Sequence, residues 1–247
     1  MPGTRGLIPM LARLISSWRI SPPAIWGKLP AQADFVRSGV RQGEAEAWTQ
    51  WLAQQGVNAD IGMTARAVSV PAAFALPPGT LWFARQRFVI GVISPSVDKA
   101  GRSHPLVIYR QEPPRRAMRY FEAQLRQPLD WQFWLARAVA RHARTNRGDI
   151  PALESTVRAL WAESCTLEKD FSVQRVRWMQ ALLDQRTGPA RDNDPAATLH
   201  GVRHLPWADW PHRLQGARAE SAFWQQDANG RFIGAANTLQ KLWSVSP

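Results

Sequence analysis

The chain has 247 residues, of which 45% are hydrophobic and 20% charged, a composition typical of a globular protein. No apolar run reaches the roughly 18–20 residues that span a bilayer, and the single cysteine, Cys165, excludes a disulfide scaffold and a cysteine-rich zinc site. The formal net charge of +12 indicates nucleic acid, anionic lipid or an acidic protein as a partner.

The positive charge is unevenly distributed. The chain has 27 arginines and only four lysines, a skew that GC-rich codon usage produces without any ligand. Between Arg115 and Arg147, however, eight arginines stand against two acids, Glu122 and Asp130. This segment predicts a basic helical face, and a nucleic-acid-binding site is one interpretation of it.

Residues 1–22 carry leucines at near-helical spacing with arginines between them and no acids. Such a pattern is typical of a weak amphipathic or transit-type segment, but it also fits a flexible tail or a start codon placed too far upstream. We expect a flexible tail. Because no export signal is recognisable, we expect the protein to be cytoplasmic.

The first half of the chain predicts strands around two loops, from apolar runs bounded by glycine and proline. The expected elements are a strand at 24–28, a helix at 43–55, a turn at 77–79, and two antiparallel strands at 88–93 and 106–109 joined by a loop at 95–102.

The second half predicts helices and then a hairpin. Trp131, Trp134, Leu135, Ala138 and Val139 recur at helical spacing, and similar stripes follow. The expected elements are helices beginning at 113–114 and covering 131–139, 153–161 and 173–183, a loop at 187–198, a hairpin of 221–225 with 231–233 around Asn229-Gly230, and a helix at 235–243.

Strands and helices do not alternate strictly, which favours an α+β fold over a doubly wound parallel sheet. We expect an antiparallel-dominated mixed sheet flanked by helices in an αβα sandwich. Strands from both ends of the chain should share that sheet, and residues 23–247 should form a single domain.

Catalytic and metal sites are weakly supported. His200, His204 and His212 with Asp209 are the only histidine cluster, but Gly201, Pro206 and Pro211 argue against one helix that would aim them together. Ser96, Asp98 and His104 would make an imaginable triad, but no G-x-S-x-G elbow surrounds Ser96. Glu163 and Glu168 near Cys165 disfavour a thiolate there. No phosphate-binding glycine loop occurs.

Two segments, Gly27–Arg37 and Pro95–Leu106, mix glycine, proline and charged residues within an apolar frame. One interpretation is a pair of rigid turns braced by charge, with Asp34 or Asp98 against Arg102 or Arg37. The other is a rigid recognition corner. In either case we expect Asp98 to accept hydrogen bonds from backbone amides and Gly101 to have a positive φ.

These segments resemble the TagF (ImpM) family of accessory proteins of bacterial type VI secretion. Gly27–Val36 is similar to its G-K-L-P-x-x-G-D-F-V pattern, and Pro95–Leu106 matches P-S-V-D-x-x-G-R-x-x-P-L throughout. A W-x-x-W-L helix at 48–52, P-x-x-F-x-L at 71–76 and S-x-W-W at 221–224 are further, looser points of resemblance. The chain departs from the pattern at Ala33, where glycine is usual, so a positive φ there would be strained.

The resemblance implies a non-enzymatic cytoplasmic regulator that represses type VI secretion by binding an FHA-domain scaffold, with no cofactor and no small-molecule substrate. The alternative is a nucleic-acid-binding protein that uses the Arg115–Arg147 face. The residues that we single out as protein-binding candidates are Gly27, Lys28, Leu29, Pro30, Asp34, Phe35, Arg37, Pro95, Ser96, Asp98, Gly101, Arg102 and Pro105.

Overall fold

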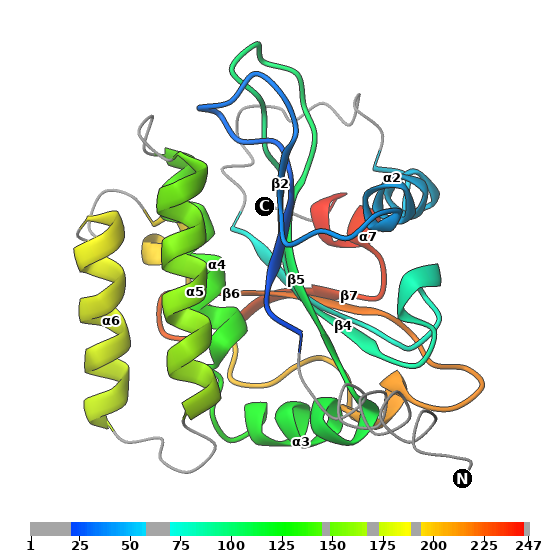
Figure 1. The fold of residues 1–247 in the computed structure, drawn as a ribbon. Helices are drawn as coiled ribbons and strands as arrows, with labels where there is room; N and C mark the ends of the chain where they lie inside the picture. Colours follow the sequence, from blue (N-terminus) through cyan, green and yellow to red (C-terminus); the bar gives the residue numbers. More distant parts are fainter. Residues whose placement is uncertain (1–20, 58–69, 145–148, 167–172, 189–193, 245–247) are drawn as a thin grey trace, which may run out of the picture.

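A seven-stranded sheet organises the protein in a computed structural model that describes residues 21–57, 70–144, 149–166, 173–188 and 194–244. The spatial order of the strands is β2-β1-β5-β4-β3-β6-β7. As predicted, strands from both ends of the chain share the sheet (Figure 1). The strands are β1 (Ala24–Gly27), β2 (Val36–Ser38), β3 (Ala72–Leu76), β4 (Phe88–Ser94), β5 (Leu106–Glu112), β6 (Ala222–Gln226) and β7 (Phe232–Ala236).

Every pairing between these strands is antiparallel, so the sheet is not mixed. The reason lies in the connections. β1 and β2, β4 and β5, and β6 and β7 are each joined by a loop too short for the crossover that a parallel pair requires. The α+β class is confirmed.

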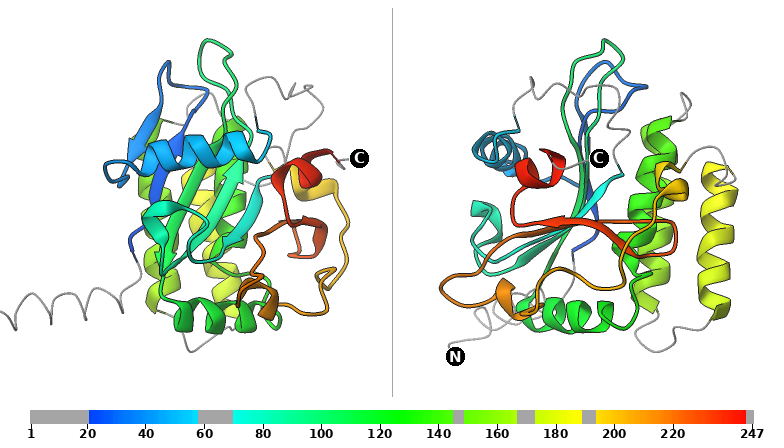
Figure 2. Two further views of the ribbon diagram at one scale, coloured as in Figure 1. Left: turned by 90° about the vertical axis from the view of Figure 1, so that its right-hand side faces the viewer. Right: turned by 180° about the vertical axis from the view of Figure 1, so that it is seen from behind.

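Helices cover both faces of the sheet, giving the αβα layering shown in Figures 1 and 2. One face packs on α2, α7 and a 3₁₀ turn, η1, around Trp48, Phe74 and Phe223. The other face packs on α4, α5 and α6 in one part and on α3 and residues 205–214 in another. The helices are α2 (Glu44–Gln54), α3 (Pro114–Gln124), α4 (Trp131–Arg144), α5 (Ile150–Thr166), α6 (Val173–Thr187) and α7 (Leu239–Ser244), with 3₁₀ turns η1 (Trp82–Ala84), η2 (Pro195–Thr198) and η3 (His212–Leu214).

β2, β3 and α7 differ from the sequence-based expectation. β2 was not predicted, because it has only three residues, Val36–Ser38, and lies within one of the motif segments. β3 was not predicted, because its five residues are all buried and show no alternation of apolar and polar side chains. The last helix begins at Leu239 and not at Ala235, since Ala235 and Ala236 pair with Trp224 and Phe223 as part of β7. The hairpin that contains Asn229-Gly230 is confirmed.

The predicted basic face between Arg115 and Arg147 is not continuous. α4 is buried on all sides from Trp131 to His142, and this includes two of its arginines. Arg137 Nε lies 3.3 Å from Asp194 Oδ2, and Arg141 Nη1 lies 2.7 Å from Asp184 Oδ1. The exposed arginines in this part of the chain are Arg115, Arg119, Arg126 and Arg144, and Arg147 lies outside the described residues.

Of the expected tail at 1–22, residues 1–20 lie outside the described residues. Ser21 is already held at the sheet, where its backbone N–H donates to Gln111 O over 3.0 Å and its Oγ accepts from Gln111 N over 2.7 Å. None of the helices in the described ranges is long and apolar enough to cross a membrane.

Candidate functional site

The two motif segments lie side by side at one end of the sheet (Figure 1). Residues 28–35 join β1 to β2, residues 95–105 join β4 to β5, and β1 pairs with β5, so both loops leave the sheet at the same place. The backbone N–H of Lys99 donates to Gln32 O over 2.8 Å, and Arg102 Nη2 donates to Ala33 O over 2.6 Å. We call residues 27–37 and 95–106 together the corner.

Asp98 is the buried centre of the corner. Its Oδ1 accepts from the backbone N–H groups of Ala100 and Arg102, each over 2.9 Å. Its Oδ2 lies 2.9 Å from Lys28 Nζ and 2.7 Å from Arg102 Nε. The predicted brace is thus Asp98 with Arg102, and Lys28 extends it to the other loop.

The environment of Asp98 favours its ionised form. Burial opposes the charge, but hydrogen bonds from Lys28 and from the backbone and side chain of Arg102 outweigh it, and the pKa of Asp98 lies well below its usual range. Asp98 is therefore a fixed anion that orients two cations.

Glycine conformations confirm the expected turn geometry. Gly101 has φ 79°, and Gly27 has φ 132°. A Cβ at Gly27 would lie 2.1 Å from Pro105 O, so only glycine allows the two loops to approach this closely. Within the described residues only glycines have positive φ, so Ala33 is not strained.

Three rings form the apolar side of the corner. Phe35 stacks on Trp26 with ring centroids 5.7 Å apart, and His104 contacts both rings edge-on at 4.6 and 4.8 Å. Lys28 Nζ lies 5.3 Å from the Phe35 ring centroid. Burial lowers the pKa of His104, and its Nδ1 lies 2.8 Å from Pro105 O. Phe35 is nonetheless 43% exposed.

The candidate residues divide into a buried base and an exposed rim. Arg102 shows how the two connect, because its side chain is 61% exposed although its guanidinium is held by Asp98. Pro30 and Pro95 are half-buried, and Gly27 is the last residue of β1. The buried members are Lys28, Leu29, Ser96, Asp98 and Pro105, and the exposed members are Asp34, Phe35, Arg37, Gly101 and Arg102.

The alternative chemistries of the sequence analysis do not assemble. Ser96 Oγ is buried without a hydrogen-bond partner among the described residues, and Asp98 is engaged by Lys28 and Arg102, so no triad with His104 forms. His200, His204, His212 and Asp209 all lie in the described part of the chain, which contains no group of three or more His, Cys, Asp or Glu side chains placed to hold a metal ion. The Cys165 side chain is outside the described structure.

Sequence reasoning named His104 only as a member of an imaginable triad and did not single out Trp26, so it missed the ring cluster beside the corner. Trp26 and His104 complete the ring cluster, and their signal was their position directly before Gly27 and Pro105 of the two motifs. The carbonyls of Gln32 and Ala33 accept hydrogen bonds from the second loop, and backbone acceptors leave no signal in a sequence.

Comparison with known proteins shows the family. A family model described as the TagF N-terminal domain, type VI secretion system-associated, matches residues 24–160. The match covers more than half of the chain and includes both loops of the corner, so the chain belongs to the TagF family and is associated with type VI secretion.

A search of curated proteins found no significant match. Among solved structures, PA0076 from Pseudomonas aeruginosa PAO1, determined at 2.05 Å resolution, is similar at 21% sequence identity with a TM-score of 0.33. The similarity covers 82% of this chain and 81% of that one.

Proposed function

We propose that this protein is a non-enzymatic regulator that represses type VI secretion in the cytoplasm by binding a protein. The expected partner is an FHA-domain scaffold of the secretion apparatus, which the resemblance of the sequence to the TagF family implies. The corner is the proposed contact surface.

The observation that carries this proposal is the exposed pair Phe35 and Arg102 on a base held by the buried Asp98. Aromatic residues, including phenylalanine, and arginine are enriched in protein–protein interfaces relative to the rest of the surface. Since hydrogen bonds and an ion pair between the loops already fix their geometry, little conformational entropy is lost when a partner docks.

Surface plasmon resonance against the immobilised FHA-domain scaffold tests the contact surface. We expect Phe35→Ala and Arg102→Ala to raise the dissociation rate about tenfold or more, as truncation of central interface residues does. Arg115→Glu and Arg119→Glu on α3 should change mainly the association rate and its salt dependence. Trp82→Ala, at a 50% exposed aromatic residue on η1, is the matched control and should bind like the wild type.

Folded corner variants that bind the scaffold with unchanged kinetics would show that these motifs are structural braces. Absence of any binding would exclude the FHA scaffold as the partner, and a pull-down from lysate with mass spectrometry would then identify the partner in its place.

A secretion assay tests the direction of regulation. Deletion of the gene should increase secretion of a type VI substrate. The wild-type gene, but not the Arg102→Ala gene, should restore the low level. Unchanged or reduced secretion after deletion would contradict repression.

A further inference from the structure

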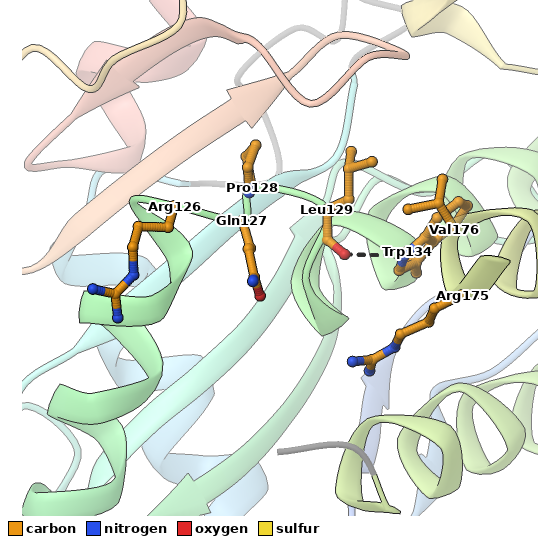
Figure 3. A pocket seen from close by; sticks show the side chains of 7 residues that line it. All are labelled: Arg126, Gln127, Pro128, Leu129, Trp134, Arg175 and Val176. Atoms are coloured by element: carbon orange, nitrogen blue, oxygen red, sulfur yellow. Dashed lines mark hydrogen bonds between the residues drawn. The ribbon is translucent and has the colours of Figure 1, made fainter. Parts of the chain in front are cut away.

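A second candidate surface lies at the end of the molecule opposite the corner, where the connection between α3 and α4 meets the beginning of α6 (Figures 1 and 2). An open cavity of about 200 Å³ is present there. Figure 3 shows the residues that line it from three elements. Those that the argument uses are Arg126, Gln127 and Leu129 of the connection, Trp134 of α4, and Arg175 and Val176 of α6.

The apolar part of this surface follows from the periodicity of α6. Met179 and Leu183 are 1% and 0% exposed and belong to the core beneath α4. The same stripe continues towards the start of the helix at Val176 and Val173, which are 37% and 71% exposed. The apolar stripe of α6 is therefore longer than the part that α4 covers, and the remainder faces the cavity and solvent.

The floor of the cavity is rigid. Trp134 is 4% exposed, and its indole Nε1–H donates to Leu129 O over 3.1 Å, which fixes the connection against α4 (Figure 3). Such a fixed apolar floor receives a side chain without first having to be ordered.

Two cations flank the apolar floor. Arg126 is exposed, and Arg175 is half-buried. Burial lowers the pKa of Arg175, and the nearby carboxylate of Glu163 opposes this effect. In the view of Figure 3 the Gln127 amide lies between the two guanidinium groups. Its Oε1 is buried and accepts no hydrogen bond from the described residues. The positive charge that the cavity offers to an occupant is therefore chiefly that of the exposed Arg126.

These features determine the kind of occupant. An apolar stripe flanked by arginines complements an amphipathic helix that has carboxylates beside its apolar residues. A second copy of this chain is a poor occupant, because two chains of net charge +12 repel each other.

We propose that this surface binds an acidic amphipathic helix of a partner protein. The apolar side chains of that helix would pack on Leu129, Trp134 and Val176, and its carboxylates would pair with the exposed Arg126. The surface is separate from the corner, so the protein could hold two partners at its two ends.

Fluorescence anisotropy with a synthetic peptide tests this proposal. The probe is a fluorescein-labelled peptide of about 15 residues, a length at which an isolated helix is marginally stable, with leucines at i, i+3, i+4 and i+7 and glutamates on the flanks. A scrambled peptide of the same composition is the peptide control. We expect the amphipathic peptide to bind the full chain and the scrambled peptide to bind far more weakly.

Matched variants locate the binding. Arg126→Glu and Val176→Asp should each weaken binding about tenfold or more, by repelling the glutamates or removing the apolar contact. Arg218→Glu and Val202→Asp make the same changes at exposed positions elsewhere and should leave binding unchanged. Circular dichroism verifies folding, and Val173→Asp replaces Val176→Asp if that variant unfolds.

Three results of the peptide assay would overturn the proposal: no binding of the amphipathic peptide, equal binding of the scrambled peptide, or wild-type affinity in the folded cavity variants. Sedimentation velocity tests whether a second copy of this chain occupies the surface. If the wild type self-associates and Val176→Asp abolishes this, the surface is an interface between two copies and the proposal is wrong.

Discussion

Asp98 connects the two loops of the corner through bonds that a neutral side chain could not reproduce. One oxygen closes the turn by accepting from two backbone amides, and the other lies against Lys28 and Arg102. An anion strengthens all four contacts, since charge-assisted hydrogen bonds are about twice as strong as neutral ones. The stability of the corner and the position of the Arg102 side chain thus depend on the same negative charge.

We expect Asp98→Asn to destabilise the protein at neutral pH by an amount that depends on pH. The pKa of Asp98 is depressed in the folded state, so its contribution to stability is present above the unfolded pKa of about 4 and is lost as the pH falls through the folded value. Urea unfolding of both proteins from pH 7 to pH 3 measures this. The difference in the free energy of unfolding should be constant above about pH 5 and shrink below about pH 4. A difference that does not change with pH would contradict a role for the charge.

Two glycines of the corner allow conformational strain to be separated from steric clash. Gly101→Ala places a Cβ in open space and should cost on the order of 1 kcal/mol in the free energy of unfolding, from the positive φ alone. Gly27→Ala adds the clash with Pro105 O and should cost clearly more. Urea denaturation compares the two variants, and equal losses would show that the close approach at Gly27 is relaxed easily.

Among the elements, α4 differs most from an ordinary surface helix. It is buried on all sides from Trp131 to His142, and its polar side chains form hydrogen bonds with other elements. Gln132 Nε2 donates to Phe74 O of β3 and to Gly91 O of β4, over 2.9 and 2.8 Å. Arg137 Nη2 donates to Gln226 O of β6 over 3.0 Å. α4 therefore fixes three strands by polar contacts in addition to its apolar stripe.

We expect Gln132→Met to lower the free energy of unfolding by about 1–3 kcal/mol, because methionine keeps the length of the side chain but leaves the buried carbonyls without this donor. Gln127→Met, at a residue whose Oε1 is without a partner among the described residues, is the matched control and should change the stability little. Chemical denaturation of the two variants makes the comparison, and equal stabilities would show that the Gln132 bonds contribute nothing net.

At the scale of the whole molecule, one sheet connects the first described strand of the chain to the last. β1 and β7 lie in the same sheet although nearly the whole chain separates them, and β3 joins the two halves through its pairs with β4 and β6. Neither half of the sheet has a complete core of its own, since the core around Trp48 and Phe74 includes residues from both.

We therefore expect a single cooperative unfolding transition, as the single-domain prediction requires. Far-UV circular dichroism and tryptophan fluorescence should give the same midpoint in urea. A transition at a different urea concentration for each probe, or two calorimetric peaks, would show that the chain divides into two domains.

The sequence by itself determined the local chemistry of this protein. The turn at Asp98–Arg102, the positive φ of Gly101 and the hairpin at Asn229-Gly230 all depend on backbone preferences of single residues. The helical stripes were also visible, because periodicity is a local property. The sequence motifs by themselves were sufficient to indicate the TagF family.

Only the tertiary structure decided which residues meet. Lys28 and Asp98 are 70 positions apart in sequence, and they form an ion pair because β1 and β5 are neighbours in the sheet. The same holds for Arg137 and Arg141, which the sequence placed on a basic face and the fold buries against Asp194 and Asp184. β3 escaped prediction for a related reason, since a strand covered on both faces has no alternation to reveal it. Charge and periodicity are properties of the sequence itself. Burial depends on which elements pack against each other, and this packing is determined by the order of the strands in the whole sheet.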